Sequence, residues 1–480
     1  MFISNIKIKN YRLFKEEDDF EILNFNVPDC INLGSGLTTI VGENGCGKTT
    51  ILDAIASTLL EYKAESFDIS NMNDPNKDTE IIIDTNDIFK VKGTFPNPDF
   101  EAKGFKFVGK TRERTNKNKL LSLIMFDQLY MSTDEEKPKP GSPDLRINVT
   151  NSFGTRRFNE LDVLYLDKNR LYQTRSGTYN DTRFDRIMDD FNFQYYKKQD
   201  NIENLNKMLN EKIKKELSNK YLEDAINKFK EISGYSLKLD FIDNYLPFKK
   251  ASLVVETPSN MQIDLSSLGS GYEMMFSLIY SFYMSKQSGK KLIILIDEPE
   301  LHLHPRLQEK FVDFILEISK ESQVILTTHS PLLIKQLAYN ENIKNIVLKK
   351  DKKVKEFDER KLSYISSNET NYLAFDLPSE EYHNELYETL MEKYGTTNFI
   401  KTFDNEFFIQ QKNEDKKYPW KKEANQVSMH TFIRNQIHHR SDNRSSQTRR
   451  FKKINRNNEI IFVVYLIKLI LQKNGSCIEK

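Results

Sequence analysis

Cysteine is scarce in this chain, and an excess of charge of either sign is absent. Three cysteines, Cys30, Cys46 and Cys477, occur among 480 residues. Their number and scatter exclude a disulfide framework and a zinc site held by cysteines. The formal net charge is +1, so only local patches of charge can indicate a class of partner. So few cysteines suit a reducing compartment, and we expect a cytoplasmic protein.

Long hydrophobic runs are also missing. The longest apolar stretch, Ile460 to Leu471, is interrupted by Lys468 and is shorter than the ~20 residues that a membrane-spanning helix needs. The N-terminal MFISNIKIKNYRLF contains no apolar core of a signal peptide. We therefore expect no membrane partner. With 38% hydrophobic and 29% charged residues, the composition is typical of a globular protein, and the length allows two or three domains.

The clearest motif is GENGCGKT, Gly42 to Thr49, which fits the phosphate-loop pattern G-x-x-x-x-G-K-[ST]. The segment Leu37–Val41 before it predicts a short buried strand, and TILDAIAS after it predicts a helix. Glycines let the backbone wrap closely around phosphate, and the N–H groups at a helix start face an anion. Lys48 is expected at the β- and γ-phosphates and the Thr49 hydroxyl at Mg²⁺. The expected nucleotide-binding residues are Gly42, Asn44, Gly45, Cys46, Gly47, Lys48, Thr49 and Thr50.

A second set of polar residues follows two buried strands far downstream. The run Leu292–Ile296 ends in Asp297 and Glu298. A carboxylate at the end of such a strand can ligate Mg²⁺, which is the role expected of Asp297, and its neighbour Glu298 can polarise the attacking water. The strand QVILTT then leads to His329, whose imidazole is expected to reach the γ-phosphate. Lys48, Glu298 and His329 are the predicted catalytic residues.

The phosphate loop, LIILIDEPELHLHP and ILTTHS together resemble the ABC-type ATPases of the SMC and OLD-like group. The resemblance covers the phosphate-loop region and roughly 261–348. It implies ATP and Mg²⁺ as ligands and a site that a second subunit completes with a signature motif, L-S-x-G-[EQ]. In this chain Leu268-Gly269-Ser270-Gly271-Tyr272 occupies that position, with departures at Gly269 and Tyr272. Ser270 and Gly271 are expected to bind the γ-phosphate of the partner's ATP. The alternative is a glycine-rich turn before a buried helix.

The same resemblance implies roles for other positions. Gln173, after the predicted strand Val163–Leu166, is the candidate for the glutamine that reaches the metal. Tyr11 and Arg12 stand where the family often contacts nucleotide, although packing at a sheet edge explains them as well. The segment ELHLHP resembles one that lines the dimer interface, so we interpret its two histidines as structural rather than as a metal pair.

The spacing of the motifs predicts the domain organisation. Lys48 and Asp297 lie 249 positions apart, so a segment is inserted between them. Glu80 to Lys110 alternates apolar and polar residues, as antiparallel strands do, and 184–232 has helical periodicity, too short for the long arms of SMC proteins. We expect an α/β, ABC-type P-loop ATPase head with a short helical insertion and a helical C-terminal domain. The expected parts are 1–180, 181–260 (insertion and return strands), 261–355 and 356–480.

The tail after 356 carries no familiar nuclease. OLD-type nucleases continue into a Toprim domain, but NIVLKKDKKVKEF predicts a polar hairpin, and no Asp-x-Asp follows it. Residues 368–395 predict a loop and then an amphipathic helix, and MHTFIRNQIHH predicts another helix. From His430 to Arg456 there are eight Arg or Lys and one Asp, a local charge of +7.

Three interpretations of this basic segment stay open. Arg434-Asn435-x-x-x-His439 fits the pattern of HEPN ribonucleases, in which the histidine would act as acid and base. Clustered arginines such as Arg449 and Arg450 also suit phosphate contacts with DNA or with an RNA–DNA hybrid of a retron. Alternatively, Arg434 and its neighbours have a structural role at a subunit contact.

The tail also resembles that of PtuA, the ATPase subunit of Septu-type and retron-associated antiphage defence. That resemblance implies homodimers or larger oligomers formed through the heads, and a separate HNH nuclease partner, PtuB. We therefore expect an ATPase that controls a partner nuclease during phage attack. The rival hypotheses are a DNA-repair or recombination ATPase acting on DNA ends, and a ribonuclease gated by ATP.

Overall fold

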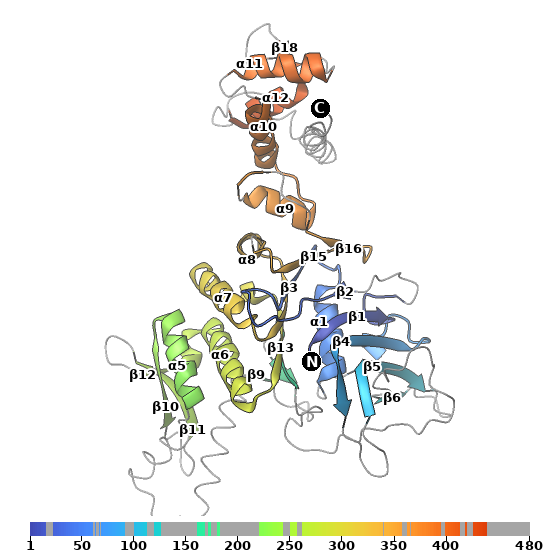
Figure 1. Cartoon of the computed structure of the whole chain (residues 1–480), viewed down its shortest axis with the longest axis vertical. Helices are drawn as coiled ribbons and strands as arrows, with labels where there is room; N and C mark the ends of the chain where they lie inside the picture. The colour runs from blue at the N-terminus through green and yellow to red at the C-terminus, as the bar shows by residue number, and fades with distance from the viewer. Residues whose placement is uncertain are drawn as a thin grey trace, which may run out of the picture. The chain divides into compact units, whose positions relative to one another are not determined.

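The computed structural model describes residues 1–15, 23–60, 63, 67, 69–91, 100–112, 120–125, 161–168, 171–173, 180–182, 220–242, 250–256, 262–338, 340–357, 362–364, 366–394, 399–412, 418–419 and 426–438. The chain divides into two compact units, Met1–Glu356 and Phe357–Lys480 (Figure 1). Each unit has a hydrophobic core of its own.

A six-stranded sheet forms the centre of the first unit. Its strands, in spatial order, are β16 (Val354–Glu356), β15 (Lys344–Leu348), β3 (Leu37–Val41), β14 (Gln323–Thr328), β13 (Lys291–Asp297) and β7 (Leu161–Leu166). All neighbours pair in parallel except β16, which returns antiparallel to β15 at the edge. The inner strands β3, β13 and β14 are buried along almost their whole length because helices or strands cover both of their faces. The buried strands predicted at Leu37–Val41, at Leu292–Ile296 and at QVILTT are confirmed as β3, β13 and β14.

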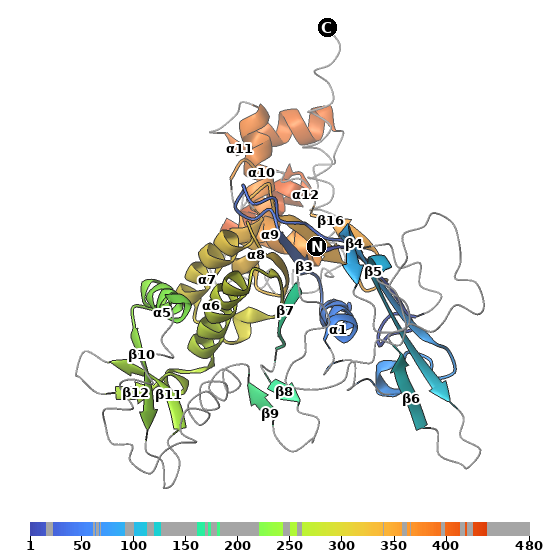
Figure 2. The ribbon, with the colours of Figure 1, turned by 60° about the horizontal axis from the view of Figure 1, so that its bottom comes forward.

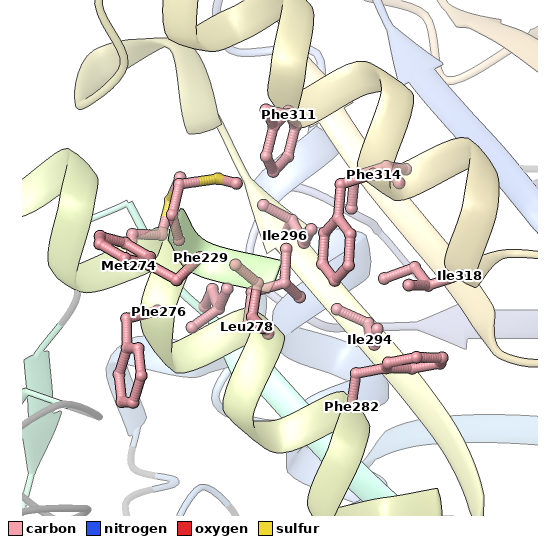
Figure 3. Close-up of a cluster of buried hydrophobic side chains, with 14 of the residues drawn as sticks. Phe229, Met274, Phe276, Leu278, Phe282, Ile294, Ile296, Phe311, Phe314 and Ile318 are labelled. Carbon is pink, nitrogen blue, oxygen red and sulfur yellow. The ribbon is translucent and has the colours of Figure 1, made fainter. Parts of the chain in front are cut away.

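Successive side chains of β13 enter two different cores, as the period of two along a strand requires. Ile293 and Leu295 pack in the core that contains α1 (Lys48–Leu59). Ile294 and Ile296 pack in the core built by α6 (Ser270–Ser288) and α7 (Pro305–Ile318), where they meet phenylalanines of both helices (Figure 3). The sheet therefore lies between helical layers. The helix predicted after the phosphate loop is confirmed as α1.

An antiparallel sheet covers α1 from the other side. Its strands, in spatial order, are β2 (Leu23–Asn24), β1 (Ile3–Lys9), β4 (Thr79–Val91), β5 (Phe100–Arg112) and β6 (Leu120–Met125). Helix α1 contacts both β4 and β5. The antiparallel strands predicted within Glu80–Lys110 are confirmed.

The segment between the two halves of the head contributes a helix and a small sheet. Helix α5 (Lys220–Ser233) packs against α6, with the Phe229 and Phe276 rings 5.9 Å apart. Strands β10 (Ser236–Ile242), β11 (Lys250–Glu256) and β12 (Gln262–Asp264) follow as an antiparallel sheet (Figure 2). The part of the predicted helical insertion at 184–219 lies outside the described residues.

Short elements complete the first unit. They are η1 (Ile69–Asn71), β8 (Leu171–Gln173), β9 (Asn180–Thr182), η2 (Leu265–Leu268), η3 (Pro299–Leu301) and α8 (Pro331–Leu337). The predicted polar hairpin after His329 is formed by β15 and β16, although β15 also joins the central sheet and buries Val347 and Leu348.

The second unit is mainly helical, as expected. Its elements are α9 (Ser367–Phe375), α10 (Glu380–Tyr394), α11 (Ile400–Phe403), the π-helix η4 (Asp404–Gln411), β17 (Tyr418–Pro419), β18 (Gln426–Val427) and α12 (Met429–His438). Buried aromatic rings from α10, α11 and η4 form its core. None of the helices in the described ranges is long and apolar enough to cross a bilayer.

The prediction of a loop at the start of 368–395 is wrong, because α9 extends over residues 368–375. The Ser366 side chain caps the helix by accepting from the backbone N–H groups of Asn368 and Glu369. Asp376, with a φ of 53°, ends it in the left-handed conformation. A helix of nine residues set by its caps has too few turns to show a clear apolar stripe in the sequence.

Candidate functional site

The phosphate loop joins β3 to α1 and curls around the ammonium of its own lysine. Lys48 Nζ donates to the carbonyl oxygens of Gly42 at 2.9 Å and Glu43 at 3.1 Å. Burial lowers the pKa of Lys48. Gly42 has a φ of 148°, and a Cβ there would meet the backbone oxygen of Leu348 at 2.2 Å, so a glycine is required.

The other predicted loop residues divide by exposure. Asn44 and Gly45 are exposed, whereas Gly47 and Thr50 are buried. The Cys46 side chain is fully buried in the core around α1, with Sγ 3.8 Å from Lys48 Nζ. Any contribution of Cys46 to phosphate binding therefore comes from its backbone.

Asp297 lies at the end of β13, next to the first turn of α1. Thr49 Oγ1 donates to Asp297 Oδ1 at 3.1 Å, and Thr327 Oγ1 donates to the same oxygen at 2.5 Å. Burial raises the pKa of Asp297 to about 6. A cation beside the carboxylate would offset this penalty, and hydroxyl and carboxylate oxygens are ligands that Mg²⁺ prefers. The residues present thus fit a magnesium site at Thr49 and Asp297.

Glu298 and His329 meet beside Lys48. Glu298 Oε1 lies 3.2 Å from His329 Nε2, and Nδ1 of the same ring lies 3.5 Å from Lys48 Nζ. Burial and the neighbouring ammonium lower the pKa of His329, so the neutral imidazole is favoured. Glu298 has a φ of 47°, and its backbone N–H donates to the Thr327 carbonyl. A non-glycine residue in this conformation costs about 1–2 kcal/mol, so the surrounding structure holds the carboxylate in place.

Glu300 has a role that the sequence did not suggest. Its Oε1 accepts from Thr328 Oγ1 at 2.9 Å and from the His329 backbone N–H at 2.6 Å. Burial raises the pKa of Glu300. This carboxylate joins η3 to the end of β14 and so fixes the backbone that carries His329. A glutamate two residues after Glu298 was the available signal, but charge alone does not reveal an inward-facing side chain.

The signature candidates Ser270 and Gly271 begin α6 and cluster around His302. His302 Nε2 lies 2.8 Å from the Lys168 carbonyl oxygen, which can only accept, so the ring proton is on Nε2. Ser270 Oγ, 3.0 Å from Nδ1, is then the donor. A Cβ on Gly271 would lie 2.3 Å from the His302 carbonyl oxygen, which explains the glycine.

Tyr272 departs from the expected glutamate or glutamine because its ring has a packing role. It forms edge-to-face contacts with Tyr235 at 5.5 Å and Phe229 at 6.3 Å. The ring anchors the start of α6 on α5 and on the turn that follows α5.

The predicted nucleotide contacts Tyr11 and Arg12 and the predicted metal contact Gln173 are placed as follows. The Arg12 guanidinium pairs with the Asp53 carboxylate, and Tyr11 Oη lies 3.2 Å from Ser57 Oγ. Both partners belong to α1, so these contacts brace the helix behind the loop. Gln173 ends β8, where its backbone pairs with Asn180; its side chain lies outside the described residues.

In the second unit, α12 carries Arg434 with its side chain directed inward. A guanidinium nitrogen of Arg434 lies 3.9 Å from Glu388 Oε1, and the group sits 5.9 Å from the centre of the Tyr387 ring. These contacts hold α12 against α10. His439, Arg449 and Arg450 lie outside the described residues.

A phosphate loop whose lysine, hydroxyl and two downstream carboxylates converge defines a P-loop nucleoside triphosphatase. Residues 1–334 match the family model described as an AAA ATPase domain, and the chain belongs to this family. It is an ATPase, which converts ATP and water to ADP and phosphate. The ABC-type P-loop head predicted from the sequence, an α/β fold, is confirmed.

Several known proteins are similar to this chain. The OLD nuclease of Thermus scotoductus is 25% identical over 331 residues, which are 65% of this chain and 58% of that protein. The Septu protein PtuA of Bacillus thuringiensis is 32% identical over 117 residues, 21% of this chain and 30% of PtuA. The retron Ec83 probable ATPase of Escherichia coli is 23% identical over 408 residues, which are 73% of this chain and 71% of that protein. The resemblance to OLD-like and PtuA-type ATPases is confirmed, although the chain spans less than two thirds of the first two proteins.

Among solved structures, an SMC head bound to the C-terminal winged-helix domain of ScpA aligns with a TM-score of 0.40 and 17% identity. It covers 75% of this chain and 99% of that one. An SMC head domain with an extended coiled coil, bound to the C-terminal domain of ScpA from Pyrococcus furiosus, aligns with a TM-score of 0.38 and 16% identity, covering 74% and 95%.

Proposed function

We propose that this chain is the ATP-dependent regulatory subunit of an antiphage defence complex. Binding of ATP closes two heads around two nucleotides, hydrolysis reopens them, and this cycle controls a partner nuclease of the HNH type. The observation that carries the proposal is the line of contacts from Lys48 through His329 to Glu298, beside the Thr49–Asp297 pair. The similarity to a Septu protein and to a retron ATPase supports the defence setting.

Each residue of the site has a distinct task in hydrolysis. Lys48 binds the β- and γ-phosphates, and the N–H groups at the start of α1 complete the anion site. Thr49 and Asp297 would hold Mg²⁺, which neutralises charge on the phosphate oxygens when it is bound. The Glu298 carboxylate accepts a proton from the attacking water. Neutral His329 donates its Nε2–H to Glu298 and so orients that carboxylate.

The second head supplies the remaining donors. Ser270 and Gly271 are at the first turn of α6, and Ser270 is exposed. A hydroxyl and backbone N–H groups at the start of a long helix suit an anion, and here that anion is the γ-phosphate bound by the other subunit. A symmetric dimer would place two such pairs against two nucleotides.

A separate nuclease fits the absence of an Asp-x-Asp after His329 in the sequence. Nucleic acid, either DNA or an RNA–DNA hybrid of a retron, is the further proposed partner, through the basic segment 430–456. A DNA-repair ATPase would bind DNA ends without a nuclease partner. A ribonuclease gated by ATP would cleave RNA by itself.

The proposal is tested by mass measurements on the Glu298→Gln variant, which should bind ATP and hydrolyse it slowly. ATP should convert this variant from smaller species to a dimer or larger oligomer, and ADP should not. Lys48→Ala in the same background is the matched control and should not respond to ATP. Co-purification with products of the neighbouring genes then identifies the partner. An ATP-independent mass for Glu298→Gln would reject nucleotide-driven closure.

A further inference from the structure

The hairpin of β15 and β16 presses a buried lysine against the phosphate loop. Lys352 is 8% exposed, and its Nζ donates to the carbonyl oxygen of Cys46 at 2.7 Å. The same ammonium lies 5.3 Å from the centre of the Phe14 ring, a favourable cation–π distance. Burial of an ammonium is costly without such partners, so the placement of Lys352 is specific to this loop.

The turn of the hairpin directs the lysine toward the loop. Lys352 has a φ of 66°, in the left-handed region that few non-glycine residues adopt. Its backbone N–H donates to the Lys349 carbonyl, and the Lys349 N–H donates to the Lys353 carbonyl, both at 3.0 Å. These bonds hold the strained residue in place.

The contact with Cys46 sets the direction of a donor on the opposite side of the loop. The Cys46 carbonyl and the Gly47 N–H belong to one planar trans peptide, in which they point in opposite directions. Because Lys352 holds the carbonyl toward the hairpin, the Gly47 N–H faces away from it. Gly47 has a φ of 113°, so this orientation of the peptide depends on a glycine.

We propose that Lys352 is a positioning residue of the ATP site. Its ammonium fixes the Cys46–Gly47 peptide so that the Gly47 N–H is oriented for a nucleotide phosphate before the nucleotide arrives. Its charge also adds to that of Lys48 in favouring an anion in the loop. The inference rests on the proposed assignment of Gly42 to Thr49 as the loop that binds ATP.

The chain offers a matched control on the same hairpin. Lys350 is exposed, and its Nζ lies 2.5 Å from the side chain of Glu43 rather than from a loop carbonyl. Lys350→Met therefore removes one positive charge from the hairpin without removing a backbone contact. Lys352→Met removes both and keeps the apolar stem. Lys352→Gln also removes both, because its shorter side chain places the amide too far from the Cys46 carbonyl, but it keeps a polar end.

The experiment measures the Kd of a fluorescent ADP or ATP analogue, kcat at saturating ATP, and melting without nucleotide. Lys352→Met should raise both Kd values by roughly three- to thirtyfold, the effect of losing one charge-assisted hydrogen bond, while kcat changes much less. Lys350→Met should stay within about twofold of the wild type, because exposed ion pairs contribute little. Lys352→Arg should recover part of the lost affinity.

Other results would overturn the proposal. A lower melting temperature with unchanged Kd values would make Lys352 an anchor of the hairpin only. An equal loss of affinity in Lys350→Met would assign the effect to bulk charge. If Lys352→Met does not fold, Lys352→Gln decides: a Kd raised at least about threefold supports positioning, and an unchanged Kd refutes it. Lys48→Ala, measured in parallel, tests the loop assignment separately, since retained ATP binding there would refute that assignment instead.

Discussion

The imidazole of His329 lies between Lys48 and Glu298, 3.5 Å from the ammonium and 3.2 Å from the carboxylate. An ammonium can only donate, so Nδ1 accepts and Nε2 carries the ring proton. The lowered pKa of His329 keeps this neutral form at physiological pH. One ring thereby connects the residue proposed to bind phosphate to the residue proposed to activate water.

Replacing Glu298 with glutamine should separate binding from hydrolysis. The amide has the shape of the carboxylate but cannot accept the proton of water, so kcat should fall by about 10²–10⁴-fold. The Kd for ATP should change little because Lys48 and the loop are intact. Steady-state phosphate release and nucleotide titration measure the two quantities. Unchanged turnover in Glu298→Gln would remove Glu298 from the catalytic role.

Two glycines of the phosphate loop should respond differently to alanine. At Gly42 the new Cβ would meet the Leu348 backbone oxygen at 2.2 Å, whereas at Gly45 no atom lies within 4 Å. Gly42→Ala should cost about 3 kcal/mol or more from overpacking and strain. Gly45→Ala should cost about 1–2 kcal/mol, from its positive φ alone. Calorimetry without nucleotide compares them, and equal losses of stability would contradict the packing around Gly42.

Acid should destabilise the second unit through two buried histidines. His383 Nε2 of α10 lies 3.2 Å from His430 Nδ1 of α12, and the Phe408 ring stacks on His430. Burial lowers the pKa of His383 to about 4 and that of His430 well below its ordinary value. The unfolded chain therefore binds more protons than the folded one below pH about 6.5, so stability falls as the pH falls from there toward 4.

For His383 alone this loss amounts to about 3 kcal/mol at pH 4 and below. The loss of stability is measured by unfolding the protein in urea at several pH values. The unfolded fraction is read from the hydrogen exchange of α10 peptides, with each exchange pulse given at the same fixed pH. His383→Gln removes one titrating ring and should flatten the dependence. A slope identical to that of the wild type would show that His383 does not titrate in this window.

The salt dependence of DNA binding should show whether the basic segment 430–456 contacts phosphates. If Arg449 and Arg450 contact phosphates, Arg449→Ala/Arg450→Ala should weaken binding to DNA and reduce the slope of log K against log salt by about two. Affinity measured across a salt series for wild type and variant gives this slope. Equal slopes would count against phosphate contacts at these two residues.

The ribonuclease hypothesis depends on His439 and has its own test. Wild type and His439→Ala are incubated with tRNA, and cleavage by the wild type alone would support an acid–base role for that histidine. Cleavage by both proteins, or by neither, would refute it. The inward contacts of Arg434 with Glu388 and Tyr387 lead us to expect no cleavage.

The sequence was most informative where local pattern and chemistry coincide. Leu37–Val41, the phosphate loop and α1 were predictable because a buried strand, positive-φ glycines and a helix start each leave a local signature. The strands that end at Asp297 and Thr328 were predictable for the same reason, since unbroken apolar runs indicate strands covered on both faces.

Contacts between distant segments could not be predicted. Nothing near Glu300 shows that its carboxylate holds the backbone of His329, and nothing near Lys352 shows that it reaches Cys46. Likewise, nothing near Tyr272 in the sequence shows that its ring packs on Phe229 of α5 and on Tyr235 in the turn after α5. Such pairings depend on the tertiary arrangement, which residue spacing does not encode.

The hairpin at the phosphate loop also gives the head a mechanical connection. Strand β16 runs from the Lys352 turn to Glu356, where the first unit ends and the second begins. Tension on the segment between the units would thus be carried by β16 to a turn whose lysine binds the phosphate loop. The chain that leaves the ATPase head is thus tethered at the phosphate loop, the proposed binding site of the γ-phosphate.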